Sequence, residues 1–253
     1  MKFIYVLSAE ILKTKRTWNF ALVLLLPSIV SIIVFGYYFK SIIGQEITGG
    51  NNVWISYSRI FFQFYSFLYP LLAAIIAFSL SNIEHKNNGF KQLFTFPVNK
   101  SYIYFSKVII LIFWIFSSLL LAYSLMMLSG DILSVLFPQI GFQNYDVNIV
   151  IITFFIRIFI TLISIVSIHF FLSIYWDNFI ISVGSATFLV IFGMLIYKWK
   201  YSFLIPYCNI QNAFMHFFRN GTQVFSDDIL WSILYSIVFF VGGYIIMLRR
   251  DII

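Results

Sequence analysis

The chain alternates between long apolar runs and short polar stretches. Six runs reach the roughly 20 residues that an α-helix, rising about 1.5 Å per residue, needs to cross a hydrocarbon core of about 30 Å. Their apolar residues are continuous and do not alternate with polar ones, which favours helices over the strands of a membrane barrel. The pattern predicts an all-α, polytopic membrane protein with six transmembrane helices, at residues 18–39, 60–83, 108–128, 147–174, 179–197 and 229–248.

Composition supports lipid as the solvent of this chain. Hydrophobic residues make up 61% of it and charged residues only 10%, whereas a soluble domain has about 25% charged residues. The net charge of +7 would suit a nucleic-acid-binding protein, but the basic residues lie beside the apolar runs. We therefore expect a single transmembrane domain over residues 1–253 and no nucleic-acid partner.

The basic residues also predict the orientation, because cytoplasmic loops carry an excess of Lys and Arg. Both termini are predicted to be cytoplasmic, which leaves segments 40–59 and 198–228 outside. The abundance of Ile, Phe, Lys and Asn suggests an AT-rich bacterial genome, so we expect a bacterial cytoplasmic membrane. We expect the aromatic residues of these two segments to form a belt at the outer interface. The cytoplasmic side then holds Lys2, Lys13, Lys15, Arg16, Lys86, Lys91, Lys100, Lys107, Arg249 and Arg250, the outside holds Lys40, Arg59, Lys198, Lys200 and Arg219, and the belt comprises Trp54, Tyr57, Trp199, Tyr201, Tyr207 and Trp231.

The segment before the first span has an amphipathic pattern. Apolar residues recur there at helical spacing, while charged residues fall elsewhere on the helix. Two interpretations remain open: an interfacial helix that lies in the inner membrane surface, or a cytoplasmic extension of the first span. The apolar positions are Phe3, Ile4, Leu7, Ile11 and Leu12, and the charged ones are Lys2, Glu10, Lys13 and Arg16.

The sequence lacks the patterns of an enzyme. Its histidines are dispersed, at His85, His169 and His216, and it contains no zinc-like spacing and no glycine-rich phosphate loop. All nine acids fall in predicted loops or tails, so no carboxylate sits in mid-membrane to drive proton- or sodium-coupled transport. We therefore expect no catalytic residue, no metal and no bound cofactor, and an energy source outside this chain. His169 is expected to be a hydrogen bonder in helix packing.

One charge lies inside a predicted span. Arg157 is about 15 Å below the outer end of the fourth helix, where a charge costs roughly 2.5–3.5 kcal/mol on insertion scales. Thr153, Thr161 and Ser164 fall on the same side of the helical wheel and make a polar stripe with it. One interpretation is a substrate path or subunit interface. The other is an arginine that bonds backbone carbonyls and snorkels outward.

The polar segment between the second and third spans, residues 84–107, is the most informative. Phe90, Leu93 and Phe94 have helical spacing, and Pro97 ends the pattern. This predicts a short helix parallel to the membrane on its cytoplasmic side.

The order of residues in this segment resembles a known family. An acid at Glu84, a glycine at Gly89, the helix, the run Pro97-Val-Asn-Lys100 and finally Lys107 are similar to ABC-2 type transporter permeases, and within them to lantibiotic-immunity permease subunits. A second signature of that group resembles residues 168–184. Two positions depart from that signature: His169 stands where a Gln is expected, and Trp176-Asp177 where a basic residue is usual. These departures weaken the assignment of the substrate more than the assignment to the superfamily.

The resemblance implies a permease that forms a homodimer or a heterodimer with a sister permease and docks two copies of a cytoplasmic ABC ATPase. ATP and Mg would be bound by that ATPase. In the lantibiotic-immunity group the cargo is a cationic, membrane-active antimicrobial peptide; the alternatives are export of a bacitracin-like antibiotic or a lipid. A non-transporting scaffold or sensor and a membrane-embedded enzyme are rival classes. The residues expected to couple to the ATPase are Glu84, Gly89, Phe90, Leu93, Phe94 and Pro97.

Overall fold

A computed structural model describes residues 2–14, 17–44, 52–85, 99–146, 148–218 and 223–249. These residues form eight α-helices and no strands, so the all-α prediction is confirmed. The helices are α1 (Lys2–Thr14), α2 (Asn19–Ile43), α3 (Val53–His85), α5 (Lys100–Leu136), α6 (Asn148–Tyr175), α7 (Ser185–Ile196), α8 (Pro206–Phe218) and α9 (Asp227–Arg249). Short 3-10 turns lie at Pro138–Ile140, Phe142–Asn144 and Ser202–Leu204, and a π-helical turn, Ile180–Gly184, precedes α7.

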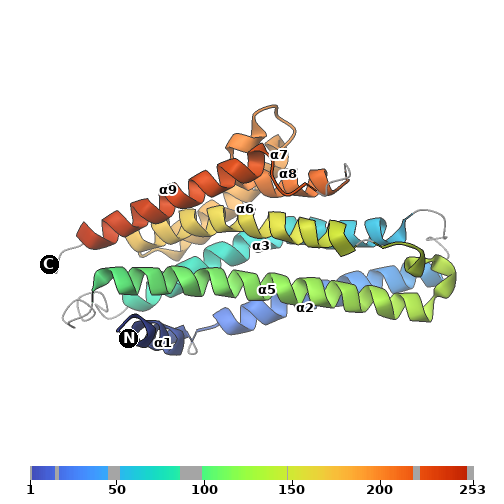
Figure 1. Ribbon diagram of the computed structural model, residues 1–253, viewed down its shortest axis with the longest axis horizontal. Helices are drawn as coiled ribbons and strands as arrows, with labels where there is room; N and C mark the ends of the chain where they lie inside the picture. The colour runs from blue at the N-terminus through green and yellow to red at the C-terminus, as the bar shows by residue number, and fades with distance from the viewer. Residues whose placement is uncertain are drawn as a thin grey trace.

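The four longest helices, α2, α3, α5 and α6, run along the long axis of the molecule (Figure 1). Helix α6 packs most extensively against α9 and α3, and α2 packs against α5. Helix α1 lies against α5, at the same end of the molecule as the C-terminal end of α9 (Figure 1). Helix α8 packs beside α6 and α9, and α7 packs against α8 and α3. One end of the bundle therefore gathers α1 and the ends of α3, α5 and α9.

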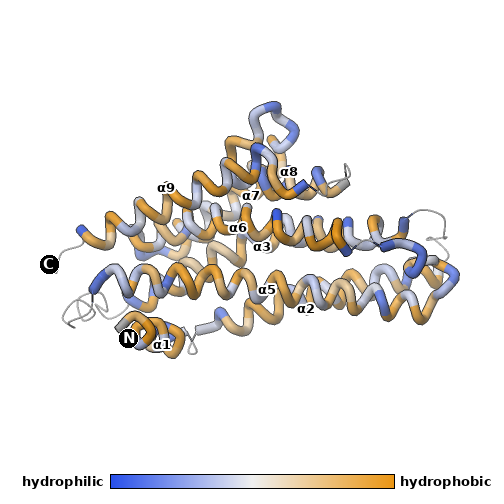
Figure 2. Tube along the Cα trace, viewed as in Figure 1, coloured by the Kyte–Doolittle hydropathy of each residue, from blue (hydrophilic) through white to orange (hydrophobic). Residues whose placement is uncertain are grey.

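Five helices are long and apolar enough to cross a membrane: α2, α3, α5, α6 and α9. The fifth predicted span, 179–197, is found as a shorter apolar helix, Ile180–Ile196, so the total of six spans stays a prediction. Helices α3 and α5 extend by whole turns beyond the predicted 60–83 and 108–128. Hydropathy locates only the part of a helix that lipid surrounds, whereas the backbone hydrogen bonds continue into the polar ends seen in Figure 2.

The core of the bundle is aromatic. Tyr57, Phe61, Tyr65 and Tyr69 recur every four residues on α3, and each is fully buried. Successive rings of this series contact one another, with centroids 5.1 to 5.8 Å apart. A residue four positions along a helix lies on the same face, so one face of α3 forms an aromatic seam against α2 and α5.

The predicted aromatic belt is partly wrong. Trp54 and Tyr57 are 5% and 0% exposed because both belong to α3, which begins at Val53 inside the predicted outside segment. Tyr207 is also buried, at 5% exposed. Trp199 and Tyr201, by contrast, remain at the surface, at 53% and 45% exposed. Hydropathy alone does not separate an interfacial aromatic residue from a buried one.

Segment 198–228, predicted as a loop, contains a helix. Helix α8 packs against α3, α6, α7 and α9. Its sequence does carry a helix signal: Pro206 occupies the first turn, where proline is favoured, and apolar residues follow at spacings of three and four. The buried ones are Tyr207, Ile210, Ala213 and Phe217.

Helix α1 is not a continuation of the first span, because Thr17 and Trp18 between α1 and α2 are not helical. Some of its apolar side chains point away from the bundle, Ile4 at 66% exposed and Leu12 at 60%, whereas Val6 and Leu7 pack against the core. Glu10, on the polar face, is instead buried. The exposed apolar side chains are free to contact lipid, as an interfacial helix requires; the location of α1 in the interface stays a prediction.

Candidate functional site

Four charged side chains meet at the end of the bundle where α1 lies (Figure 1). Glu10 and Lys13 come from α1, Glu84 from the last turn of α3 and Lys107 from the third turn of α5. Each lysine contacts both glutamates. The Nζ–Oε distances are 2.6 Å for Lys13–Glu10, 2.8 Å for Lys13–Glu84, 2.7 Å for Lys107–Glu10 and 3.1 Å for Lys107–Glu84. We call this set the four-charge cluster.

The four-charge cluster is electrically balanced and largely buried. Glu10, Glu84 and Lys107 are at most 3% exposed. Burial by itself would raise the pKa of Glu10, but attraction to Lys107 and Lys13 outweighs it and lowers that pKa below 4.5. Burial likewise opposes protonation of Lys13, yet Glu10 and Glu84 raise its pKa above 10.5. Glu10 and Lys13 are therefore both charged at neutral pH, and each stabilises the other.

The cluster ties together α3 and α5, the two helices that flank segment 86–98. Glu84 lies two residues before that segment. On the other side, the Asn99 side chain accepts a hydrogen bond from the Ser101 amide at 2.9 Å and caps the start of α5. Lys107 also donates to the Leu80 carbonyl of α3 at 3.4 Å. The two helix ends that flank the segment are thus tied to each other and to α1.

Of the residues predicted to couple to an ATPase, the structure places only Glu84. The others, Gly89, Phe90, Leu93, Phe94 and Pro97, lie outside the described residues, so their role stays a prediction. The placement of all acids in loops or tails was partly wrong, because Glu84 belongs to α3 and Asp131 to α5, whereas Asp146 and Asp177 lie in connections as predicted. The sequence does not predict that Glu10 and Lys13 of α1 meet Glu84 and Lys107, since nothing in the pattern shows which face of an amphipathic helix meets the bundle.

A second cluster surrounds Arg157 in α6, which is 1% exposed. Its Nη1 donates to the carbonyls of Gln223 and Val224 at 2.9 and 3.1 Å. Its Nη2 donates to the Ser226 hydroxyl at 2.8 Å and to the two carboxylate oxygens of Asp228 at 2.9 and 3.2 Å. The guanidinium therefore ties the middle of α6 to the start of α9 and to the chain that leads into it.

This geometry corrects two expectations. Arg157 bonds the backbone carbonyls of Gln223 and Val224, as one interpretation expected, but it is buried and does not snorkel to the surface. Its partner Asp228 lies in the first turn of α9, not in a loop. The hydroxyls of Thr153, Thr161 and Ser164 are buried as the stripe predicts, but each donates to a carbonyl of α6 itself. The stripe therefore lines one buried face of α6. A role of these residues in a substrate path or subunit interface stays a prediction.

Hydrogen bonds from two side chains of α8, Tyr207 and Asn209, hold this helix in place. The His169 ring in α6 is hydrogen-bonded to the Tyr207 hydroxyl, which confirms the packing role predicted for this histidine. The Asn209 side-chain amide donates to the Asp228 carbonyl and to the Ser232 hydroxyl, both at 3.0 Å. Helix α8 thus braces the same turn of α9 that holds Arg157.

Both clusters pair their charges internally, which suits them to holding helices. Within residues 2–14, 17–44, 52–85, 99–146, 148–218 and 223–249, no three His, Cys, Asp or Glu side chains are placed to hold a metal ion. The expectation that the chain binds no metal or cofactor stays a prediction.

Comparison with known proteins identifies one family. The sequence profile described as ABC-2 family transporter protein matches residues 6–193, which include the whole four-charge cluster and Arg157. No curated protein and no solved structure matches the chain.

Proposed function

Since the chain belongs to the ABC-2 family of transporter proteins, we propose that it is the transmembrane subunit of an ATP-driven exporter that expels a cationic antimicrobial peptide. Membership of this family implies a partner ABC ATPase. The observation that carries the proposal is the four-charge cluster at the end of the bundle where α1 lies.

The four-charge cluster is suited to transmit movement from the ATPase to the transmembrane helices. Segment 86–98 connects two long helices whose ends are clamped by Glu84 and Lys107. A push from the ATPase on this segment would move α3 and α5 together, and would carry α1 through Glu10 and Lys13. Breaking a buried ion pair by removing one partner costs about 3–5 kcal/mol, so these connections are stiff enough to transmit such a movement.

We assign segment 86–98 to the cytoplasmic side, together with both termini, in a bacterial cytoplasmic membrane. ATP and Mg bind to the partner ATPase, and this chain contributes no catalytic residue. The assembly contains two permeases, identical or sister chains, and two ATPases. The cargo assignment is supported by the likeness of segment 84–107 to lantibiotic-immunity permeases.

The coupling role is tested with the double variant Gly89→Pro and Phe94→Asp. It removes an aromatic anchor of the kind that dominates protein interfaces and disfavours a helix at the segment. We expect loss of co-purification with the cognate ATPase and loss of ATP hydrolysis by the assembled complex. Trp199→Asp, in the exposed α7–α8 connection, is the control and is expected to behave as wild type.

Normal co-purification and normal ATP hydrolysis in the double variant, at wild-type expression, would contradict the coupling role and favour a scaffold or sensor. The cargo is tested by the growth of cells exposed to a cationic lantibiotic and, separately, to bacitracin. Protection against the lantibiotic alone is expected. Protection against bacitracin alone would show that the cargo assignment is wrong while leaving the exporter assignment intact.

A further inference from the structure

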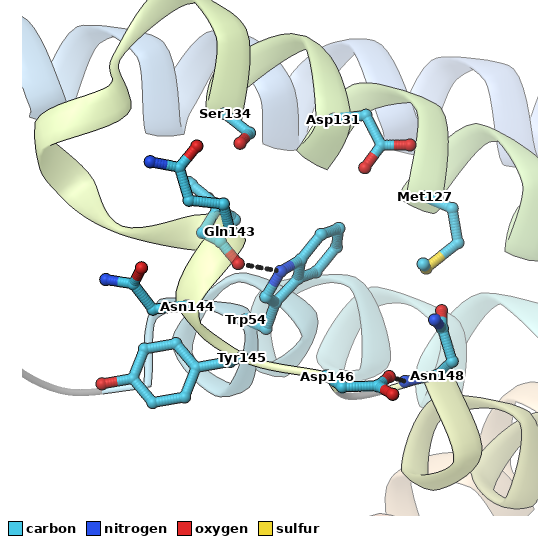
Figure 3. A pocket seen from close by; sticks show the side chains of 10 residues that line it. Trp54, Met127, Asp131, Ser134, Gln143, Asn144, Tyr145, Asp146 and Asn148 are labelled. Carbon is cyan, nitrogen blue, oxygen red and sulfur yellow. Dashed lines mark hydrogen bonds between the residues drawn. The ribbon is translucent and has the colours of Figure 1, made fainter.

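A pocket of about 520 Å³ lies at the end of the bundle opposite to α1. It is formed by the start of α3, the last turns of α5, the connection from α5 to α6, and the start of α6 (Figure 3). Its volume is in the range of small-molecule sites, about 300–1,000 Å³. Nothing in the coupling machinery described above uses it.

The floor of the pocket is held rigidly. The Trp54 indole N–H donates to the Phe142 carbonyl at 2.9 Å, which ties α3 to the α5–α6 connection. The same ring packs directly over Gly130 of α5, where a Cβ atom would come within 2.3 Å of it. Tyr57 adds a hydrogen bond to Ser129 at 2.7 Å. These contacts fix the floor of the pocket without a ligand.

Among the described residues that line the pocket, the charged ones are Asp131 of α5 and Asp146 of the α5–α6 connection, and none is Lys or Arg. Asp146 accepts a hydrogen bond from the Asn148 amide at 3.2 Å through one oxygen, which orients the carboxylate and leaves the other oxygen available. Asp131 has no ion pair or side-chain hydrogen bond within the part of the chain that the structure describes. Figure 3 shows the two carboxylates on different walls.

The remaining polar lining groups can accept hydrogen bonds from the same ligand. Ser134, Gln143 and Asn144 contribute a hydroxyl and two amide oxygens around the opening. Carboxylates bound to Lys or Arg groups form charge-assisted hydrogen bonds, which are roughly twice as strong as neutral ones. A ligand with several N–H donors and a positive charge would satisfy both walls at once.

We propose that this pocket binds an organic cation, a primary amine or a guanidinium group such as the side chain of Lys or Arg in a peptide. The pocket is far larger than a bare metal ion needs, since one water molecule occupies only about 30 Å³ of liquid volume. If the orientation under the proposed function holds, the pocket opens to the outside, where it would meet a cationic cargo; that link alone rests on the proposed function.

The test uses the purified full-length permease in detergent, with fluorescently labelled hexalysine as the probe and fluorescence anisotropy as the readout. Both carboxylates are exposed, and an exposed ion pair is worth up to about fivefold in affinity. Asp131→Asn and Asp146→Asn should therefore weaken binding about two- to fivefold each, and the double variant more than either. Labelled hexaglutamate should not bind.

Two variants separate the pocket from general attraction to acidic protein. Asp177→Asn removes an exposed acid from the α6–α7 connection and should leave hexalysine binding unchanged. Ser134→Trp keeps both carboxylates but fills the pocket, and should abolish binding. Size-exclusion elution identical to wild type shows that each variant is folded.

Unchanged binding in the Asp131→Asn, Asp146→Asn double variant, or equal weakening by Asp177→Asn, would overturn the proposal. Binding of Ca²⁺ that depends on both carboxylates, without hexalysine binding, would replace the organic cation by a metal ion and overturn it as well. Hexalysine binding needs no ATPase, so it can succeed where co-purification with the ATPase fails, and the two proposals can fail separately.

Discussion

Replacing Arg157 by leucine leaves several groups without their donor. Two guanidinium nitrogens make five contacts shorter than 3.3 Å, to two backbone carbonyls, one hydroxyl and the carboxylate of Asp228. Because Asp228 is 6% exposed, the substitution leaves a buried carboxylate without its counter-ion. Removing one partner of a buried pair costs about 3–5 kcal/mol, and we expect Arg157→Leu to destabilise the permease by that amount.

The assay is a double-mutant cycle on the free energy of unfolding in mixed micelles, titrated with a denaturing detergent. Arg157→Leu and Asp228→Leu should each be strongly destabilising. The double variant should be about 2–3 kcal/mol more stable than the sum of the single effects predicts, because neither charge is then left unpaired. Arg157→Lys should restore stability only in part, since lysine does not reproduce the planar, bidentate geometry.

Additive effects in the cycle, within about 0.5 kcal/mol, would refute the pairing of Arg157 with Asp228. A wild-type unfolding free energy for Arg157→Leu alone would have the same meaning. Either result would return this residue to the role of an arginine that reaches the membrane surface on its own.

Two further predictions concern packing and pH. A Cβ at Gly193 of α7 would lie 3.0 Å from the backbone of Tyr207 in α8. Gly193→Ala should therefore force the two helices apart and lower stability by about 1–3 kcal/mol, as measured in a thermal melt. Gly36→Ala is the control and should be neutral or stabilising, because nothing lies within 4 Å of a Cβ at that position. The pKa of Glu10 is lowered below 4.5, so its contribution to stability is complete above that pH and is lost as the pH falls below it. The melting temperature should therefore drop on acidification below pH 4.5 in the wild type, and Glu10→Gln should remove part of that drop; an identical drop in the variant would exclude Glu10 as the titrating group.

Much of the fold could be predicted from hydropathy alone. The long apolar runs correspond to α2, α3, α5, α6 and α9, and the predicted ABC-2 family is confirmed by the profile match. The likeness to lantibiotic-immunity permeases in particular stays a prediction. The runs predict helices reliably because lipid leaves a spanning backbone no other way to satisfy its hydrogen bonds.

The charge pairs could not be predicted in the same way. Lys107 and Glu10 are separated by 97 residues in the sequence, and Arg157 and Asp228 by 71. Hydropathy shows that a helix is amphipathic, but not which neighbour its polar face meets. The predicted last span begins at residue 229, two residues after the start of α9 at Asp227, and so leaves Asp228 in a loop.

The central claim is that segment 86–98 contacts the ATPase. The most direct measurement places a photoreactive phenylalanine analogue at position 94, in place of Phe94, in cells that also express the cognate ATPase. Irradiation should yield a covalent permease–ATPase product. The same analogue in place of Tyr145, which is exposed at the opposite end of the bundle, should yield none. A product from position 145 but not from position 94 would contradict both the coupling role and the orientation.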